Sequence, residues 1–551
     1  MISRIKKALR TIRREGISAG YSAFLRQIDK GRRDREYRDW AERYDTLDDA
    51  GRERLQAIAA ELSDAPLISV LMPVYNVEER FLCEAIGSVR AQIYPNWELC
   101  IADDASTEPH VRRVLEELAA QDARIRVTFR EKNGHISAAS NTALEMVRGE
   151  FTALMDHDDL LAKDALLQAA RVITSRPEVN LIYSDEDKID AYGVRFQPMF
   201  KPDWSPELMR SLNLITHLCV FRTEVLRAIG GFRTGLEGSQ DYDLSLRFID
   251  SISPETIVHI PQVLYHWRAI PGSVALDSGE KTYAHERART ALTEQYRRSG
   301  IAARAVRGRG ELHRPKFLGQ PPKVSVILWG EGSSDIDLGR VHEVREAAGD
   351  VGSIVREANE ASGDVLVFLH RDSGQLSANF FEELAHRAAI KGVGAVGPKL
   401  LDADRRIANA GFVLGIMNGI GRPHRGLRRD DLGPFVGLAA DRNVLALSLA
   451  AMAVERKTFA DAGGLDDSFG DPVTSGIDLC LWLHAAGKRN VWTPWAEATS
   501  ANASNDVGEE SIARLRARWQ EYFDRDPYYN PNLTAEGEGL GFAKPPRISR
   551  Y

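Results

Sequence analysis

The hydrophobic pattern from residue 65 onward alternates between short apolar runs and stretches with helical periodicity. Leu67–Val74 is a nearly continuous apolar run with Pro73 close to its end, which is typical of a strand buried on both faces. Further strands are expected at Trp97–Ala102, Ile125–Phe129 and Phe151–Met155, and helices at Glu84–Gln92, His110–Gln121 and Ser137–Val147. This alternation predicts an α/β fold with a mostly parallel sheet and helices on both faces.

The second half of the chain echoes the first. Lys323–Leu328 resembles Ile68–Met72, the stretch 363–372 resembles 149–158, and Val454–Leu465 resembles Phe221–Phe232. Two diverged copies of one domain explain these echoes better than one very large sheet does. The expected organisation is a basic, amphipathic and helical segment at 1–64, a first copy at 65–305, a Gly-, Pro- and Arg-containing linker at 306–322, a second copy at 323–535, and a tail at 536–551.

The composition is that of an ordinary globular protein. Charged residues make up 27% and the hydrophobic set 43%, which excludes disorder of the whole chain. There is no run of about 20 apolar residues that would span a bilayer, and the N-terminus lacks the apolar core of a secretory signal. The four cysteines are far apart in the sequence, which argues against a disulfide framework or a cysteine zinc site and indicates a reducing cytosol.

Charge is unevenly spread along the chain. Residues 1–35 hold eleven Lys or Arg against three acids, whereas the remainder carries a net charge of −15, which disfavours general nucleic-acid binding. Ile2, Ile5, Leu9 and Ile12 recur at helical spacing among these basic residues, so residues 2–14 are expected to form an amphipathic helix. Two interpretations remain: peripheral contact with an anionic membrane surface, and a solvated helix that packs on the body of the protein.

Polar side chains follow several of the expected strands. Asp156–Asp159 places three carboxylates in four residues, and Asp103–Asp104 and Tyr75–Asn76 also come at strand ends. In α/β sheets, ligands bind at the carboxyl ends of the strands, and oxygen ligands suit Mg²⁺ or Mn²⁺. The other interpretation is a solvated acidic turn with helix-capping residues. Gln240–Asp241 at the start of an apolar-periodic stretch offers either a general base or an acidic first turn favoured by the helix dipole.

An ordered set of motifs across residues 66–300 resembles the inverting glycosyltransferases of family 2, which have the GT-A fold. The set consists of Pro73–Asn76, Asp103–Thr107, Asn133–Gly134, Ala139–Asn141, Asp156–Asp159, Gly230–Phe232 and Gln240–Asp243. Three longer strings resemble the branch that builds bacterial surface polysaccharides and O-antigen; they are Ser184–Asp190, Lys201–Pro206 and Tyr265–Ala275. The resemblance implies two GT-A-like domains in tandem, of which the first is catalytic.

The resemblance also implies residue roles. Asp158, with Asp156, would hold a divalent cation (Mn²⁺ or Mg²⁺), Asp104 beside Asp103 would read the nucleotide base, and Asp241 would be the general base. The implied nucleotide-sugar contacts are Pro73, Tyr75, Asn76, Asp103, Asp104, Asn133, Gly134, Asp156 and His157.

The chain departs from the family pattern at several positions. Gln240 stands where the family has Glu, and a third metal ligand is assigned only to His266, with Arg268 at the closer alignment. Trp204 and Trp267 are either sugar-stacking residues or core and rim tryptophans. The acceptor-side candidates are therefore Trp204, Gln240, Trp267 and Arg268.

The second copy lacks most of these features. From Ser69 to Asp158 is 89 residues, whereas from the matching Ser325 to Asp372 is 47, so the tract that would carry the nucleotide-reading turn is missing. Arg371 stands in the metal string, and Ser475–Gly476 replaces the acidic pair. We expect a non-catalytic module for acceptor binding, docking or dimerisation; the alternative is an active transferase with a metal-free site.

The expected function is transfer of a sugar from a nucleoside-diphosphate sugar to a lipid-linked glycan or growing surface polysaccharide. The expected location is the cytoplasm, peripheral to the inner face of the plasma membrane. Two other functions stay open: a sugar-nucleotide- or glycan-binding protein without turnover, and a haloacid dehalogenase-type phosphotransferase with Asp156 as nucleophile. The sequence does not specify the sugar, the nucleotide, the acceptor or the oligomeric state.

Overall fold

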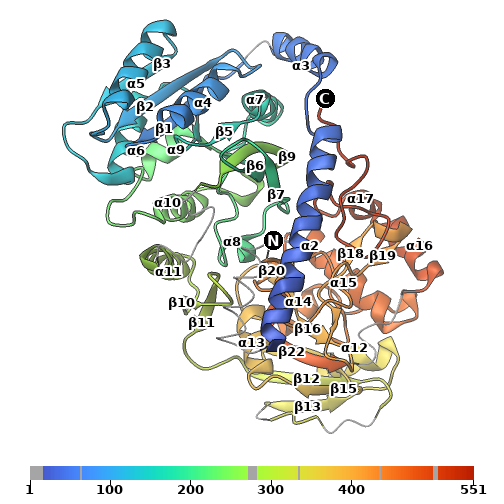
Figure 1. The fold of residues 1–551 in the computed structure, drawn as a ribbon. Coiled ribbons are helices and arrows are strands. Elements are labelled where there is room, and N and C mark those ends of the chain that lie inside the picture. Colours follow the sequence, from blue (N-terminus) through green and yellow to red (C-terminus); the bar gives the residue numbers. More distant parts are fainter. Residues whose placement is uncertain are drawn as a thin grey trace.

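The computed structural model describes residues 17–62, 65–270, 282–332, 336–339, 341–433, 436–500 and 507–551, with side chains described from residue 31. It consists of two α/β bodies, each built on a nine-stranded sheet, with the long helix α2 (Ile17–Tyr44) alongside (Figure 1). The amphipathic helix expected at residues 2–14 lies outside the described residues. No described helix combines the length and apolar character needed to cross a membrane.

The first half of the N-terminal sheet is parallel, as predicted. Strands β1 (Ile68–Val74), β2 (Trp97–Asp103), β3 (Ile125–Phe129) and β4 (Phe151–Leu154) lie in the order β3-β2-β1-β4. Between them run α4 (Glu79–Arg90), α5 (Pro109–Gln121) and α6 (His135–Met146). All four strands therefore end at one edge of the sheet, which is where ligands bind in such folds.

The second half of this sheet is mixed. β8 (Cys219–Arg222) joins β4 antiparallel, followed by β6 (Leu181–Ile189), β9 (Ile257–Arg268) and β5 (Leu160–Leu161), with β7 (Arg195–Met199) paired to β6. The helices are α7 (Ala165–Ser175), α8 (Pro206–Met209), α9 (Thr223–Ala228), α10 (Gln240–Ile249) and α11 (Thr282–Arg298), with the 3₁₀ turn Pro254–Thr256. The α/β class is confirmed, and the antiparallel strands are an addition to the predicted parallel sheet.

The stretch predicted as a linker is not irregular. β10 (Ala303–Arg307) and β11 (His313–Phe317) pair as an antiparallel hairpin that packs on α11. The small apolar side chains Ala303 and Ala305 are buried and alternate with exposed arginines, and Gly310 adopts φ +60° in the connection. The Gly and Arg content that suggested a linker at 306–322 belongs to this connection and to the exposed face of the hairpin.

The second sheet repeats the strand order of the first, without a counterpart of β3 among its described strands. Its order is β13-β12-β14-β21-β16-β22-β15, against β2-β1-β4-β8-β6-β9-β5. The strands are β12 (Val324–Trp329), β13 (Glu343–Glu346), β14 (Val365–His370), β15 (Ser373–Leu376), β16 (Val393–Leu401), β21 (Ala451–Glu455) and β22 (Arg489–Ser500), with β17 (Ile407–Asn409) and β20 (Arg442–Asn443) at its side. The helices are α12 (Val351–Glu360), α13 (Phe380–Ala388), α14 (Arg456–Asp461), α15 (Pro472–Ala485), α16 (Glu509–Arg518) and α17 (Gln520–Asp524), and β18 (Val413–Leu414) pairs with β19 (Ile420–Gly421).

The same arrangement of hydrogen bonds also occurs at the start of the sheet in each body. Ser69 Oγ accepts a hydrogen bond from Gly149 N at 2.9 Å and donates to Glu98, while Ser325 Oγ accepts from Gly363 N at 2.8 Å and donates to Glu343. A Cβ on Gly149 or Gly363 would lie 2.7 or 2.5 Å from the serine oxygen, so both positions require glycine. Strand order and this contact together favour an internal duplication.

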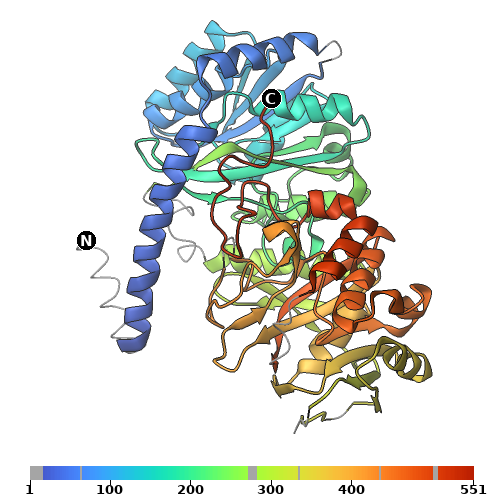
Figure 2. The same cartoon turned by 90° about the vertical axis from the view of Figure 1, so that its right-hand side faces the viewer.

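The chain returns to the first body at its end (Figure 2). Arg550 forms ion pairs with Asp164 before α7, at 2.6 Å, and with Asp45 after α2, at 2.8 Å. Phe542 packs with Tyr37 and Trp40 of α2. The segment predicted as a tail at 536–551 is therefore docked, because its arginine and aromatic side chains have buried partners that are distant in sequence.

Candidate active site

Five of the predicted nucleotide contacts line one cavity. Pro73, Tyr75, Asp104, Asn133 and His157 surround a cavity of about 290 Å³, together with Val74, His135, Ile136 and Ala139. These residues come from the ends of β1 and β2, the loop after β4, and the start of α6. The convergence of strand ends inferred from the sequence therefore takes place in the structure.

Asp104 is buried at the floor of this cavity and is held on two sides. Its Oδ1 accepts hydrogen bonds from Arg130 Nε and from Gly134 N, both at 2.9 Å. Asn133 Nδ2 in turn donates to the backbone oxygen of Asp104 at 3.2 Å. A Cβ at Gly134 would lie 2.6 Å from the Arg130 guanidinium, so glycine allows the loop to approach. Asp104 thus organises the pocket wall and contributes to its lining.

Three non-glycine residues with positive φ surround the same pocket: Asn76 at +46°, Ala105 at +60° and His135 at +64°. Such backbone strain gathers at functional sites. Two of the predicted nucleotide contacts, Asn76 and Asp103, stabilise these turns and do not line the cavity. Asn76 Oδ1 accepts from Thr107 N at 2.8 Å, and Asp103 Oδ2 accepts from Ser106 N at 3.2 Å.

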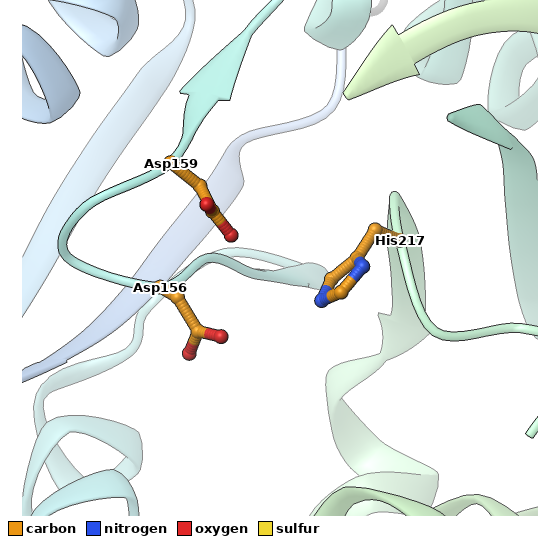
Figure 3. Close-up of side chains that lie close together, drawn as sticks. All are labelled: Asp156, Asp159 and His217. Atoms are coloured by element: carbon orange, nitrogen blue, oxygen red, sulfur yellow. The ribbon is translucent and has the colours of Figure 1, made fainter. Parts of the chain in front are cut away.

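A cluster of acids and one histidine adjoins the pocket. Asp156, Asp159 and His217 each offer a ligand atom within 4.8 Å of the others, and Figure 3 shows the imidazole facing the two carboxylates. Asp159 is committed elsewhere, because Tyr265 Oη donates to its Oδ2 at 2.7 Å and Arg268 N to its Oδ1 at 2.6 Å. Burial, and then the neighbouring acids Asp158 and Asp156, raise the pKa of Asp159 well above its usual range.

Asp156 links this cluster to the predicted base. Burial raises its pKa, the His217 charge opposes that rise, and the Asp158 and Asp241 carboxylates add to it. The Asp158 and Asp241 carboxylates are therefore both close enough to Asp156 for their charges to raise its pKa. A divalent cation relieves such crowding, and carboxylate oxygens with an imidazole are ligands it accepts. The residues present thus fit the cation that the family resemblance implies.

His217 is a candidate site residue that the sequence interpretation missed. Its Nδ1 lies 2.8 Å from Glu186 Oε2, and its ring stacks on Tyr265 with centroids 4.5 Å apart. Burial alone would lower the pKa of His217, but the Glu186 carboxylate overcomes this and raises the pKa to about 9. A histidine oriented by a carboxylate through one ring nitrogen presents its other nitrogen in a fixed direction.

Asp241 stands in the first turn of α10, as predicted. Asn213 Nδ2 donates to its Oδ2 at 3.0 Å, and burial raises the pKa of the carboxyl. The neighbouring Gln240 uses its Oε1 to accept from Gly238 N at 2.7 Å, which holds the turn before the helix. No interaction of Gln240 with Asp241 through their side chains is present among the described residues.

Four other assignments require correction or restatement. The Arg268 side chain, assigned to the acceptor side, is fully buried, pairs with Glu84 at 2.8 Å and covers Phe81. His266 lies outside the ligand cluster and its Nδ1 is 2.6 Å from Asp187 Oδ1. Trp204 is partly buried against the core, and Trp267 receives the Lys188 ammonium over its ring at 4.8 Å.

Strand β6 supplies a row of buried acids whose role was not anticipated. Asp185, Glu186 and Asp187 are 0–1% exposed, and each carboxylate has a histidine partner: His259, His217 and His266 respectively. Consecutive acids in a strand point to both faces of the sheet, so burial requires basic partners on both sides. The run Ser184–Asp190 was the available signal, and its density of acids in an apolar context indicates an internal network.

The corresponding region of the second body is differently equipped. Asp372 is held by His370 Nδ1 at 2.6 Å and by Ser500 Oγ at 3.1 Å, and Arg371 pairs with Glu346 at 3.0 Å. Within the described part of the chain, the only group of three metal-ligating side chains is Asp156, Asp159 and His217 of the first body.

Comparison with known proteins decides the family. Residues 69–229 match the model of the family described as Glycosyl transferase family 2. The first body thus carries a segment of this family at residues 69–229. The recognition of this family from its motifs is thus confirmed.

Two curated relatives match most of the chain. An uncharacterized protein of Sinorhizobium fredii, y4gI, is 39% identical over 89% of this chain, and the O-antigen biosynthesis protein RfbC of Myxococcus xanthus is 31% identical over 89%. The chain spans 60% and 42% of the lengths of these relatives. Among solved structures, S. aureus TarS 1–349 in complex with UDP-GlcNAc is 20% identical, with 42% of this chain and 72% of that chain covered and a TM-score of 0.33. That likeness is too distant to assign a role to any residue.

Proposed function

We propose that the family 2 domain transfers a sugar from a nucleoside-diphosphate sugar to a glycan acceptor with inversion at the anomeric carbon. The observation that carries this proposal is the continuity between pocket and acids. His157 lines the nucleotide-sized cavity and places its Nδ1 3.1 Å from Pro73 O, while its neighbour Asp156 experiences the charges of Asp158 and Asp241. This proximity supports a donor pocket, cation ligands and base that share one crevice.

The donor would enter with its base and ribose in the cavity beside Tyr75 and Asp104. Asp156 and Asp158 would hold the divalent cation beside His217, which faces Asp156. When bound, such a cation supplies positive charge to the diphosphate leaving group. Tyr75 is 44% exposed at the rim, so its ring is free to stack on a base.

Asp241 would accept the proton of the attacking hydroxyl. Its raised pKa favours a carboxylate that accepts protons nearer to neutral pH, and Asn213 fixes the direction of Oδ2. Attack from the face opposite to the leaving group gives inversion, through a transition state with oxocarbenium character.

The second body would brace the first without performing transfer. It lacks the ligand cluster in its described residues, yet it contacts the first body through Ser205 with Asn443 and Glu207 with Arg489. The cytoplasmic location and the membrane contact through residues 2–14 belong to this proposal, as does a polysaccharide or lipid-linked acceptor. The name of the RfbC relative supports a role in surface-polysaccharide synthesis.

The test is turnover by the full chain with a panel of nucleoside-diphosphate sugars, with and without Mn²⁺, read as release of nucleoside diphosphate. The proposal predicts Mn²⁺-dependent release for one nucleotide class, and the same class raises the melting temperature. If a nucleoside-diphosphate sugar bound saturably but were not turned over when an acceptor is supplied, the result would instead indicate a binding protein. A phosphate bound covalently to Asp156 would indicate a phosphotransferase. If no nucleotide bound, both the proposed donor class and the proposed nucleotide pocket would be contradicted.

A further inference from the structure

A second cavity lies away from the transferase site, where four parts of the chain meet. Its volume is about 110 Å³. Phe200 and Ser205 come from the first body, Phe412 and Arg442 from the second, and Tyr528 and Phe542 from the chain end, with Arg33 of α2 at the rim. A cavity of this size holds several waters or a ligand of a few heavy atoms, because one water requires about 10–15 Å³ of such volume. A nucleotide sugar is much too large for it.

The cavity is lined by basic side chains. They include Arg33, Arg442 and His424, and none of the described lining residues is Asp or Glu. The nearest acid to influence Arg442 is Asp526, whose two oxygens accept from the backbone N–H groups of Leu414 and Tyr528. Asp526 lies outside the lining and forms no ion pair with Arg442 in the described part of the chain.

Arg442 holds its guanidinium in place with only part of its donor capacity. Nε donates to Gly437 O at 2.9 Å, Nη2 donates to Ala410 O, and the group lies over the Trp492 ring at 4.9 Å. A guanidinium has five N–H donors, so three are left for a further acceptor. Burial lowers the pKa of Arg442 to about 10, which still leaves it charged at neutral pH.

His424 provides an independent observation at the same cavity. Its residue is 8% exposed, and its Nδ1 is a buried atom without a hydrogen-bond partner. Burial, and then the Arg442 charge, lower the pKa of His424 well below its usual range, so the ring is neutral. A buried polar atom without a partner next to a partly paired cation costs free energy unless a bound group supplies the missing acceptor or donor.

We infer that this cavity, which we name the junction chamber, binds a small oxyanion between Arg442 and His424. The ligand class is a phosphate or carboxylate group carried by a molecule of a few heavy atoms. The aromatic residues Phe200, Phe412, Tyr528 and Phe542 would exclude water around it and strengthen the charge interaction. Because the chamber is built from both bodies, α2 and the chain end, the ligand would also stabilise their docking.

The test uses the full chain in chloride buffer of constant ionic strength, with inorganic phosphate in one arm and acetate in the other. Binding is measured by titration calorimetry and by the melting temperature. We expect saturable binding in at least one arm, and the arm that binds distinguishes phosphate from carboxylate chemistry. Arg442→Met should weaken that binding at least tenfold, while the control Arg304→Met, at an exposed arginine of β10, should leave it unchanged.

Phosphate bound at the nucleotide pocket would be insensitive to Arg442→Met, so that result overturns the inference, as does the lack of saturable binding in both arms. His424→Phe keeps the ring volume and removes the nitrogens, and it should also weaken binding. If Arg442→Met does not fold, His424→Phe alone is the test. An unchanged affinity for the bound anion overturns the proposal, and a loss of affinity supports it.

Discussion

Asn213 donates a hydrogen bond from Nδ2 to Oδ2 of Asp241 over 3.0 Å, and its own Oδ1 is buried without a partner. The amide comes from the segment between α8 and β8, and the carboxylate from the first turn of α10. The same segment carries His217, which faces Asp156. One short stretch of chain therefore positions both the proposed base and the surroundings of the proposed cation.

Replacement of Asn213 by Ala should lower the turnover number about tenfold, because a hydrogen bond to a charged group contributes about 1.5–3 kcal/mol. The Asn213 hydrogen bond lowers the pKa of Asp241, so its removal should raise that pKa and move the acidic limb of the rate profile to higher pH. A pH–rate series on the variant measures both effects. Asn96→Ala, at an exposed amide, is the control, and a profile that does not move would show that Asn213 does not orient the base.

Asp241→Asn keeps the side-chain volume and removes the proton acceptor. Turnover should fall by about 10²–10⁴, the usual contribution of a general base, while nucleotide affinity changes little. Steady-state turnover and nucleotide titration measure the two quantities separately. Glu150→Gln, an exposed acid before β4, should retain full activity. If Asp241→Asn kept activity within tenfold of the parent, another group would have to take the proton.

Asp158 and Asp159 should respond differently to amidation. The Asp158 carboxylate receives no hydrogen bond or ion pair from the described residues, whereas both oxygens of Asp159 are engaged by Tyr265 and Arg268. Asp158→Asn should therefore raise the Mn²⁺ concentration for half-maximal activity at least tenfold with unchanged stability. Asp159→Asn should instead lower the free energy of unfolding by about 1–3 kcal/mol. Mn²⁺ titration and urea unfolding distinguish the two, and identical behaviour of the variants would contradict the assignment.

His259 should make stability depend on pH. It lies between Asp185 Oδ1 at 2.9 Å and Asp203 Oδ1 at 3.0 Å; burial alone would lower its pKa, and the carboxylates raise it above its ordinary value. The stabilisation is thus complete below about pH 6.5, the unfolded value, and is lost as pH rises through the folded pKa. Urea unfolding across this range should show His259→Gln losing this dependence. An equal pH slope in parent and variant would exclude His259 as its source.

Arg550 should contribute strongly to stability although it is next to the last residue of the chain. Its partners Asp164 and Asp45 are 0% and 8% exposed by side chain; Asp45 also pairs with Arg195, so Arg550→Met leaves the buried Asp164 carboxylate without a cation. Removal of one partner of a buried pair costs about 3–5 kcal/mol. Chemical unfolding measures this loss, with the exposed Lys544→Met as control. Asp164→Asn in the Arg550→Met background should restore part of the loss, and strict additivity of the two changes would argue against their coupling.

The parallel half of the first sheet could be predicted from the sequence because its signals are local. Leu67–Val74 and the helical periodicities after it specify each element, and the edge at which the strands end then brings Asp104 and Asp156 near one crevice. The β10–β11 hairpin was not predicted, because its small alanines and its arginines give only a weak alternation of apolar and polar residues. Its glycines indicated a linker instead.

The remainder of the site depends on contacts between distant positions. His217 and Glu186 are 31 residues apart, and Asn213 and Asp241 are 28 apart, in segments without a regular period. The family resemblance suggested His266 as a metal ligand, but a resemblance carries no information on the competing carboxylate of Asp187. Arg268 was chosen by alignment alone, and its burial against Phe81 has no local signal.

The ion pairs of Arg550 have a consequence for synthesis of the protein. The N-terminal residues of a domain leave the ribosome first and usually fold first. Here the buried Asp164 receives its cationic partner only after 386 further residues have been added. The first body must therefore wait, with this buried acid uncompensated, until Arg550 has been translated. A chain cut before Arg550 would leave Asp164 without its cation even where every residue of the proposed crevice is already present.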